Sequence, residues 1–252
     1  THFEMLQPYD VLAREAERKL GRTLTPSEDP FYTGKALRTT HDARAKYMVE
    51  KGMIDLAGNI VGTPLQDIRA LVKDRREDFT AYLWAKRALA LWNDPKNTAR
   101  NPGLSIQDAE QIVKELDNPN FQLAAQKVYD WNQGVLNYAA QASPSFAAIV
   151  EKIKAVDPGY YIPLNREFRE LDEMWARAAI RGAKGGSPIA RLKGSGRQIK
   201  DPFPQMISNA RNIIRSAHQR MIVDQTIKLS KIEGMGHLVE KVPVEQIPAA
   251  TR

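Results

Sequence analysis

The segment that follows Asn118 constrains the fold more than any other part of the chain. Its apolar residues return at every third or fourth position: Phe121, Ala124, Ala125, Val128, Trp131, Val135, Tyr138, Ala139 and Ala142. This spacing places them on one face of a helix, because a half-buried strand would instead need strict alternation. The segment therefore predicts a long helix with one buried face over residues 119–142.

Signals for helix ends occur along the rest of the chain. A capping residue followed by proline, which favours the first turn of a helix, occurs at Thr25-Pro26, Thr63-Pro64, Asn118-Pro119 and Ser143-Pro144. Glycines that favour helix ends lie at Gly21, Gly52, Gly182 and Gly234. With the apolar spacing, they predict helices over residues 9–20, 34–51, 64–75, 78–93, 105–116, 119–142, 144–156, 165–181 and 203–232.

Strand signals are weak by comparison. The nearest candidate is the run at residues 238–244, where Pro243 limits any strand to a sheet edge. We therefore predict an all-α fold, a bundle of about eight to nine helices with a long basic, glycine-rich connector. A chain of 252 residues can bury a sizeable core. We expect an N-terminal helical bundle at residues 1–158 and a C-terminal helical segment at 159–252, packed as one unit.

The helices predicted over residues 78–93 and 165–181 differ in how much of their surface we expect to be buried. Residues 78–93 carry apolar side chains almost all around the helix, which predicts burial on nearly every side. Lys86 and Arg87 interrupt this pattern, and we interpret them as salt-bridged or extended to solvent rather than as a ligand site. Residues 165–181 pair Arg166 with Glu170 at i,i+4 spacing, which is typical of a solvated face.

The most unusual composition lies at residues 181–200. This connector contains five glycines and no acidic residue, and its basic residues are Arg181, Lys184, Arg191, Lys193, Arg197 and Lys200. Glycine leaves backbone amides accessible and the basic side chains supply charge, a combination that suits contact with phosphates. The expected helix after it places Arg211, Arg215 and His218 on one face. Residues 177–220 hold ten Lys or Arg against one acid, Asp201, while the whole chain carries +7.

Three interpretations of this basic region stay open. It can be a flexible linker without a ligand, a nucleic-acid contact, or a surface for a protein partner. It lacks the spacing of a phosphate-binding P-loop, and the connector has no aromatic residue on which bases could stack. The candidate nucleic-acid contacts are the six basic residues of the connector together with Arg211 and Arg215, the nucleic acid being DNA or RNA.

Catalytic and metal-binding patterns are not found in the sequence. The chain has no cysteine, and its four histidines show no metal-ligand spacing. His41 shares a helical stripe with Leu37, Ala45 and Met48, which predicts a core histidine. Glu167 and Glu170 raise the possibility of a glycan-cleaving enzyme, but they lie among arginines in ion-pair spacing. We expect no catalytic residue, metal or cofactor, no transmembrane segment and no secretion signal. The first residue is Thr1, which suggests an excised piece of a longer protein.

Several short motifs, in order, resemble the helical "large polyvalent protein-associated" domains of bacteriophages and mobile elements. They are Asp29-Pro30-Phe31-Tyr32, Tyr82-Leu83-Trp84-Ala85-Lys86-Arg87-Ala88, Asn101-Pro102-Gly103-Leu104-Ser105, Gly159-Tyr160-Tyr161-Ile162-Pro163, Lys193-Gly194-Ser195-Gly196-Arg197 and Glu233-Gly234-Met235-Gly236. The resemblance implies a non-catalytic structural or interaction module within a very long phage protein. Its partners would be other domains of that polypeptide. It would travel in the virion with ejected DNA and then reach the host cytoplasm. A free-standing nucleic-acid-binding helical protein is the alternative.

Overall fold

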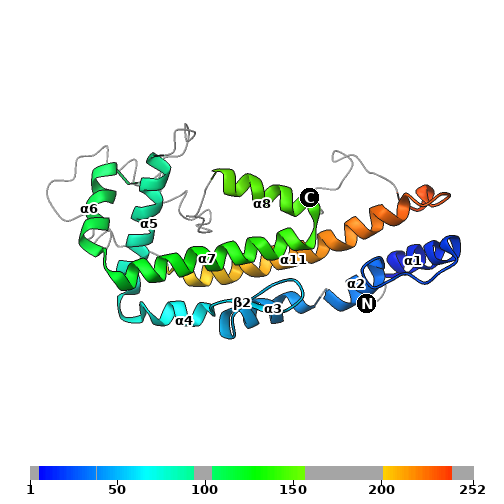
Figure 1. Ribbon diagram of the computed structural model, residues 1–252, viewed down its shortest axis with the longest axis horizontal. Coiled ribbons are helices and arrows are strands. Elements are labelled where there is room, and N and C mark those ends of the chain that lie inside the picture. Colours follow the sequence, from blue (N-terminus) through cyan, green and yellow to red (C-terminus); the bar gives the residue numbers. More distant parts are fainter. Residues whose placement is uncertain (1–5, 38, 94–103, 157–200, 240–252) are drawn as a thin grey trace. The chain divides into compact units, whose positions relative to one another are not determined.

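The protein is all-α in the parts of the chain that the structure describes. The computed structural model describes residues 6–37, 39–93, 104–156 and 201–239 (Figure 1). Within these residues it has nine α-helices and one small two-stranded sheet. The expected helix over residues 165–181 lies outside the described residues. The chain divides into two compact units, Thr1–Asp42 with Arg215–Arg252, and Ala43–Ile214. This division differs from the one we expected near residue 158.

The first unit is built from both ends of the chain. It contains α1 (Gln7–Leu20), α2 (Pro30–Leu37), the latter part of α11 (Pro202–Ser230) and a short 3-10 turn at Gly236–Leu238. Its hydrophobic core consists of Leu12, Ala13, Ala16, Leu24, Leu229 and Met235, so residues far apart in sequence pack together. Burying these apolar side chains is the main force that holds the two ends of the chain in one unit.

The second unit is organised around α7 (Pro119–Ala142). This helix contacts α4 (Leu65–Ala70), α5 (Arg76–Trp92), α8 (Pro144–Val156) and both strands of the sheet. The remaining elements are most of α3 (Thr40–Glu50), a 3-10 turn at Lys73–Arg75, α6 (Ile106–Leu116), which packs on α5, and the first part of α11. Phe79 contacts Phe121 edge to face, with ring centroids 5.3 Å apart, and stacks on Phe203 at 6.4 Å. These rings join three helices in one core.

Several expected helix ends are confirmed. Asn118 accepts a hydrogen bond from the amide of Phe121 at 3.0 Å and begins α7, and Ser105 caps α6 through the amide of Asp108. Ser143 precedes α8 and accepts from the amide of Ser145. Gly21 ends α1 with a φ of 65°, a left-handed conformation that suits glycine. Each cap satisfies a backbone group that the helix itself leaves unpaired.

Two other expected helix starts are wrong in detail. Thr25 and Glu28 bond to each other, but they close a single turn, and Asp29 caps the helix that begins at Pro30. Thr63 does not cap α4, because Pro64 occupies the N-cap position, and the hydroxyl of Thr63 instead accepts a hydrogen bond from Lys127. The local capping patterns therefore predicted turns at these positions, but they did not predict the hydrogen-bond partners of the threonine side chains.

The expected helix over residues 34–51 is two helices. The first, α2, ends at Leu37, and α3 begins at Thr40, whose hydroxyl donates to the carbonyl of Leu37 at 2.9 Å. This bond satisfies a carbonyl at the end of α2 and competes with continuation of the helix. The expected helix over 64–75 is also shorter, since α4 ends at Ala70 and a 3-10 turn follows.

The burial of α5 agrees with the expectation from its sequence. Phe79 through Ala85 and Ala88 are buried, while Trp92 at its end is 42% exposed. Lys86 is half-buried, and its ammonium lies 5.4 Å from the ring centroid of Tyr82. The hydroxyl of Tyr82 donates to Asp117 at 2.6 Å. Lys86 is thus held within a polar contact between α5 and the end of α6.

A small β-hairpin was not expected. Strand β1 (Met53–Ile54) is buried and pairs antiparallel with β2 (Ile60–Gly62), which is exposed. Gly52 precedes it with a φ of 140°, and a Cβ at that position would lie 2.7 Å from the carbonyl oxygen of Gly62. Glycine is therefore required there, both for its conformation and for the close approach of the two strands.

Candidate functional site

Two of the eight candidate nucleic-acid contacts lie in the described structure. Arg211 and Arg215 are exposed and stand one turn apart on α11. The other six candidates, Arg181, Lys184, Arg191, Lys193, Arg197 and Lys200, lie outside the described residues. Glu167 and Glu170, which we weighed as glycan-cleaving carboxyls and interpreted as ion-paired, also lie outside them.

His218 does not join the two arginines, contrary to our expectation. Its side chain is buried, 3% exposed, and its Nδ1 lies 3.1 Å from the carbonyl oxygen of Leu37. The reason is a change in the buried stripe of α11. Met206, Ala210 and Ile214 are buried in the second unit, whereas His218, Ile222, Gln225 and Leu229 are buried in the first. The basic face therefore ends after Arg215.

His41, in contrast, is more exposed than the core histidine that the sequence predicted. Its side chain is 24% exposed, and its Nε2 lies 3.5 Å from Asp42. Ala45 and Met48, with which it was expected to share a core stripe, are buried. The core histidine of the described structure is thus His218 and not His41.

The local charge around α11 is partly balanced. Asp201, the one acid within residues 177–220, lies 3.6 Å from Arg76. Arg220 pairs with Asp224 at 3.0 Å within the same helix. In the first pair Arg76 offsets the negative charge of Asp201, and in the second Asp224 offsets the positive charge of Arg220. Arg211 and Arg215 are the exposed arginines of α11.

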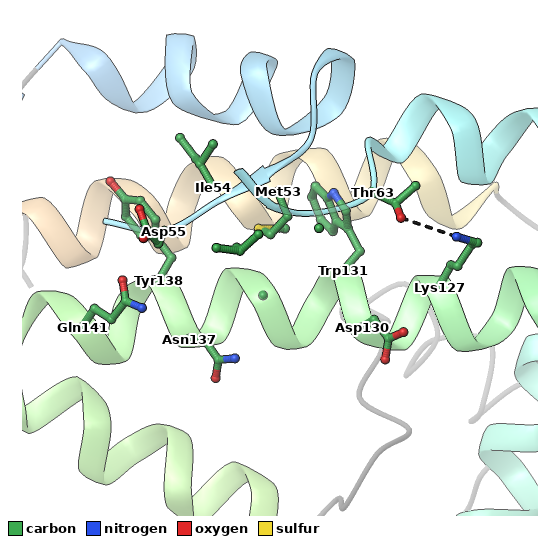
Figure 2. A pocket seen from close by; sticks show the side chains of 13 residues that line it. Met53, Ile54, Asp55, Thr63, Lys127, Asp130, Trp131, Asn137, Tyr138 and Gln141 are labelled. Atoms are coloured by element: carbon green, nitrogen blue, oxygen red, sulfur yellow. Dashed lines mark hydrogen bonds between the residues drawn. The ribbon is translucent and has the colours of Figure 1, made fainter. Parts of the chain in front are cut away.

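A pocket of about 510 Å³ lies between the hairpin and α7 in the second unit (Figure 2). Lys127, Trp131 and Tyr138 extend from α7 toward the hairpin, and Asp130 and Asn137 line the other rim (Figure 2). The hairpin side is formed by residues on both strands and after them: Met53, Ile54, Asp55, Val61, Gly62 and Thr63. A pocket of this size can take a small polar molecule.

The hairpin is fixed over α7 by a few specific hydrogen bonds. Arg44 donates through one nitrogen to the carbonyl of Leu56 and to the hydroxyl of Tyr138, both at 3.0 Å. The amide of Leu56 donates to Oε1 of Gln141 at 2.9 Å. Burial raises the pKa of Tyr138, with Arg44 opposing that shift, so the phenol stays neutral. The hairpin is therefore attached to α7 and α3 through neutral groups and one arginine.

The charged side chains that line the pocket differ in the number and strength of their hydrogen bonds. Asp55 accepts hydrogen bonds from the backbone amide and the side chain of Asn59, and these bonds lower its pKa. Asp130 accepts one from Gln126 at 2.8 Å. Lys127 makes one weak hydrogen bond, 3.4 Å to Thr63. The lining thus contains two carboxylates and one ammonium.

Within the described ranges, His, Asp and Glu side chains form no group of three that could hold a metal ion. None of the helices there is long and apolar enough to cross a membrane. Sequence reasoning missed the pocket altogether, since its residues come from the unexpected hairpin and from the polar side of α7. Glycines at 52, 58, 62 and 134 were the one available signal.

Comparison with protein-family models, with curated proteins and with solved structures found no match.

Proposed function

We propose that this chain is a non-catalytic helical interaction module that contacts nucleic acid through its late basic region, residues 177–220. The observation that carries the proposal is the exposed pair Arg211 and Arg215 on α11. Residues 201–210 separate them from a stretch of the sequence that is rich in lysine, arginine and glycine. Arginine is well suited to bind phosphate because its guanidinium is planar and always charged.

The chemistry supports binding of the nucleic-acid backbone and not of particular bases. Arg211 and Arg215 lie one turn apart, so both can meet phosphates along one strand. The expected mode is electrostatic and independent of sequence, with affinity that falls as salt rises because counterions are released. Asp201 is engaged by Arg76, so it does not cancel this charge directly.

The wider setting that we propose rests on the resemblance given above. The module would be one domain of a long phage-encoded polypeptide, carried in the virion and delivered with the DNA. A chain without cysteine cannot be trapped by a disulfide when it unfolds and refolds. The pairs α5–α6 and α7–α8 join helices that are neighbours in sequence, and such local contacts favour fast refolding.

The proposal is tested by fluorescence anisotropy with labelled random-sequence DNA and RNA at low salt. We expect binding on the order of micromolar, which weakens steeply as salt is raised. Changing Arg191, Lys193 and Arg197 to glutamate should abolish it. No binding at low salt, or unchanged binding by this triple variant, would end the nucleic-acid proposal and leave an interaction module for protein partners.

A further inference from the structure

The pocket between the hairpin and α7 offers hydrogen-bonding groups that the described protein leaves unused. Lys127 makes one hydrogen bond, at 3.4 Å, although an ammonium can donate three. Asp130 accepts one hydrogen bond, on Oδ1. These two side chains are three residues apart on one helix face, yet neither forms an ion pair with the other or with any other described group.

The other end of the pocket presents donors. The Oδ1 of Asn137 accepts from Gln133, and Oε1 of Gln141 accepts from the amide of Leu56. Their side-chain nitrogens, Nδ2 and Nε2, make no hydrogen bond to described residues. Since each oxygen is fixed by a donor, each nitrogen is available to a ligand.

The charges of the lining exclude several classes of ligand. Two carboxylates and one ammonium give the pocket a formal net charge of −1. A phosphate would bring two negative charges beside Asp130, which is unfavourable. A simple cation would leave the ammonium of Lys127 facing it. A zwitterion avoids both costs, because its carboxylate can face Lys127 while its ammonium faces Asp130.

We infer that this pocket binds a small zwitterion of the amino-acid type. Its carboxylate binds Lys127 and Thr63, and its ammonium binds Asp130. A polar, acceptor-bearing side chain extends along α7 toward the donor of Asn137, and a short peptide can extend further, toward that of Gln141. The stretch of α7 between residues 127 and 141 is roughly 21 Å long, so a free amino acid or a short peptide fits along it. This inference is independent of the proposed nucleic-acid contact.

The test uses L-glutamine as the probe and the indole N–H resonance of Trp131, which lines the pocket, as the readout. That resonance is assigned with Trp131→Phe. We expect a saturable shift with a Kd on the order of 1 mM or below. Glutaminamide, which lacks the carboxylate, and N-acetylglutamine, which lacks the ammonium, should each bind about tenfold more weakly.

Two variants assign each charge to its residue. Lys127→Gln should no longer distinguish glutamine from glutaminamide but should still disfavour N-acetylglutamine, and Asp130→Asn should show the reverse. Lys114→Gln, which removes an exposed lysine of α6, is the matched control and should behave as wild type. Each test compares the affinities of one variant for the three compounds. A small change in the stability of that variant would affect all three alike and would not change their order.

A further arm separates the two sources of such a zwitterion. Triglycine carries the same end groups farther apart, so tighter binding of triglycine than of glutamine identifies a short peptide, and the opposite order identifies a free amino acid. The inference is overturned if neither probe gives a saturable shift. It is also overturned if Lys127→Gln and Asp130→Asn leave the order of the three glutamine derivatives unchanged.

Discussion

Met53 of the hairpin packs directly against Gly134 of α7. A Cβ at Gly134 would lie 2.6 Å from Cγ and 2.9 Å from Sδ of Met53. Glycine in the interior of a helix is ordinarily unfavourable by about 1 kcal/mol relative to alanine. Here it allows the hairpin to approach α7, and the pocket wall depends on that approach.

We therefore expect Gly134→Ala to destabilise the protein despite the better helix propensity of alanine. Crowding at Met53 should cost about 1–3 kcal/mol, which outweighs the gain of about 1 kcal/mol. Urea unfolding measures the difference. Gly236→Ala is the control, since a Cβ there meets only a backbone oxygen 3.9 Å away. A stabilised Gly134→Ala variant would show that the hairpin does not approach this closely.

Tyr138→Phe should weaken the attachment of the hairpin without removing it. The variant loses the hydrogen bond from Arg44, while Arg44 keeps its bond to the carbonyl of Leu56. We expect a loss of about 1 kcal/mol in the free energy of unfolding. Arg44→Met should cost more, because it leaves both partners without their donor. Equal effects of the two changes would contradict a shared role for Arg44.

The cap of α7 gives a local test of the sequence signal. Asn118→Ala removes the acceptor for the amide of Phe121, and we expect about 1 kcal/mol of destabilisation. Asn120→Ala changes an exposed asparagine in the same turn and should have little effect. Thermal unfolding followed by circular dichroism compares the two. Similar losses in both variants would argue against the cap.

The contact between Tyr82 and Asp117 predicts a pH dependence. Hydrogen bonds from Tyr82 and then Gln122 lower the pKa of Asp117. A carboxyl with a lowered pKa stabilises the fold above its unfolded value of about 3.9, and that stabilisation is lost as pH falls through the folded value. Tyr82→Phe should therefore destabilise the protein more at pH 7 than at pH 3. Urea unfolding at both pH values checks this, and an equal difference at both would contradict it.

The helices could be predicted from the sequence because both their ends and their faces leave local signals. Asn118, Ser105 and Gly21 act where their chemistry indicates. The hairpin could not be predicted in the same way. Strands of two and three residues are too short to show alternation, and their pairing depends on Met53 finding Gly134 more than 80 residues later.

Helix α11 shows a second limit of prediction from sequence, which concerns the face that is buried. Helical spacing alone places His218 beside Arg211 and Arg215, but it assumes one buried stripe along the whole helix. The helix belongs to two units whose cores take different stripes, so His218 is buried beside Leu37. The two arginines are exposed, as predicted, because the stripe that buries His218 begins only after Arg215. The pocket could not be foreseen, since its polar residues look like an ordinary solvated face.

The salt dependence of nucleic-acid binding tests the central proposal most directly. Each phosphate contact contributes about 0.9 to the slope of log affinity against log salt on duplex DNA. Arg211→Gln with Arg215→Gln should reduce that slope by nearly two. Arg14→Gln with Arg18→Gln makes the same charge change on α1, outside residues 177–220, and should leave the slope unaltered. An equal reduction in both double variants would show that only net charge matters, and no reduction in the first would exclude α11 from the interface.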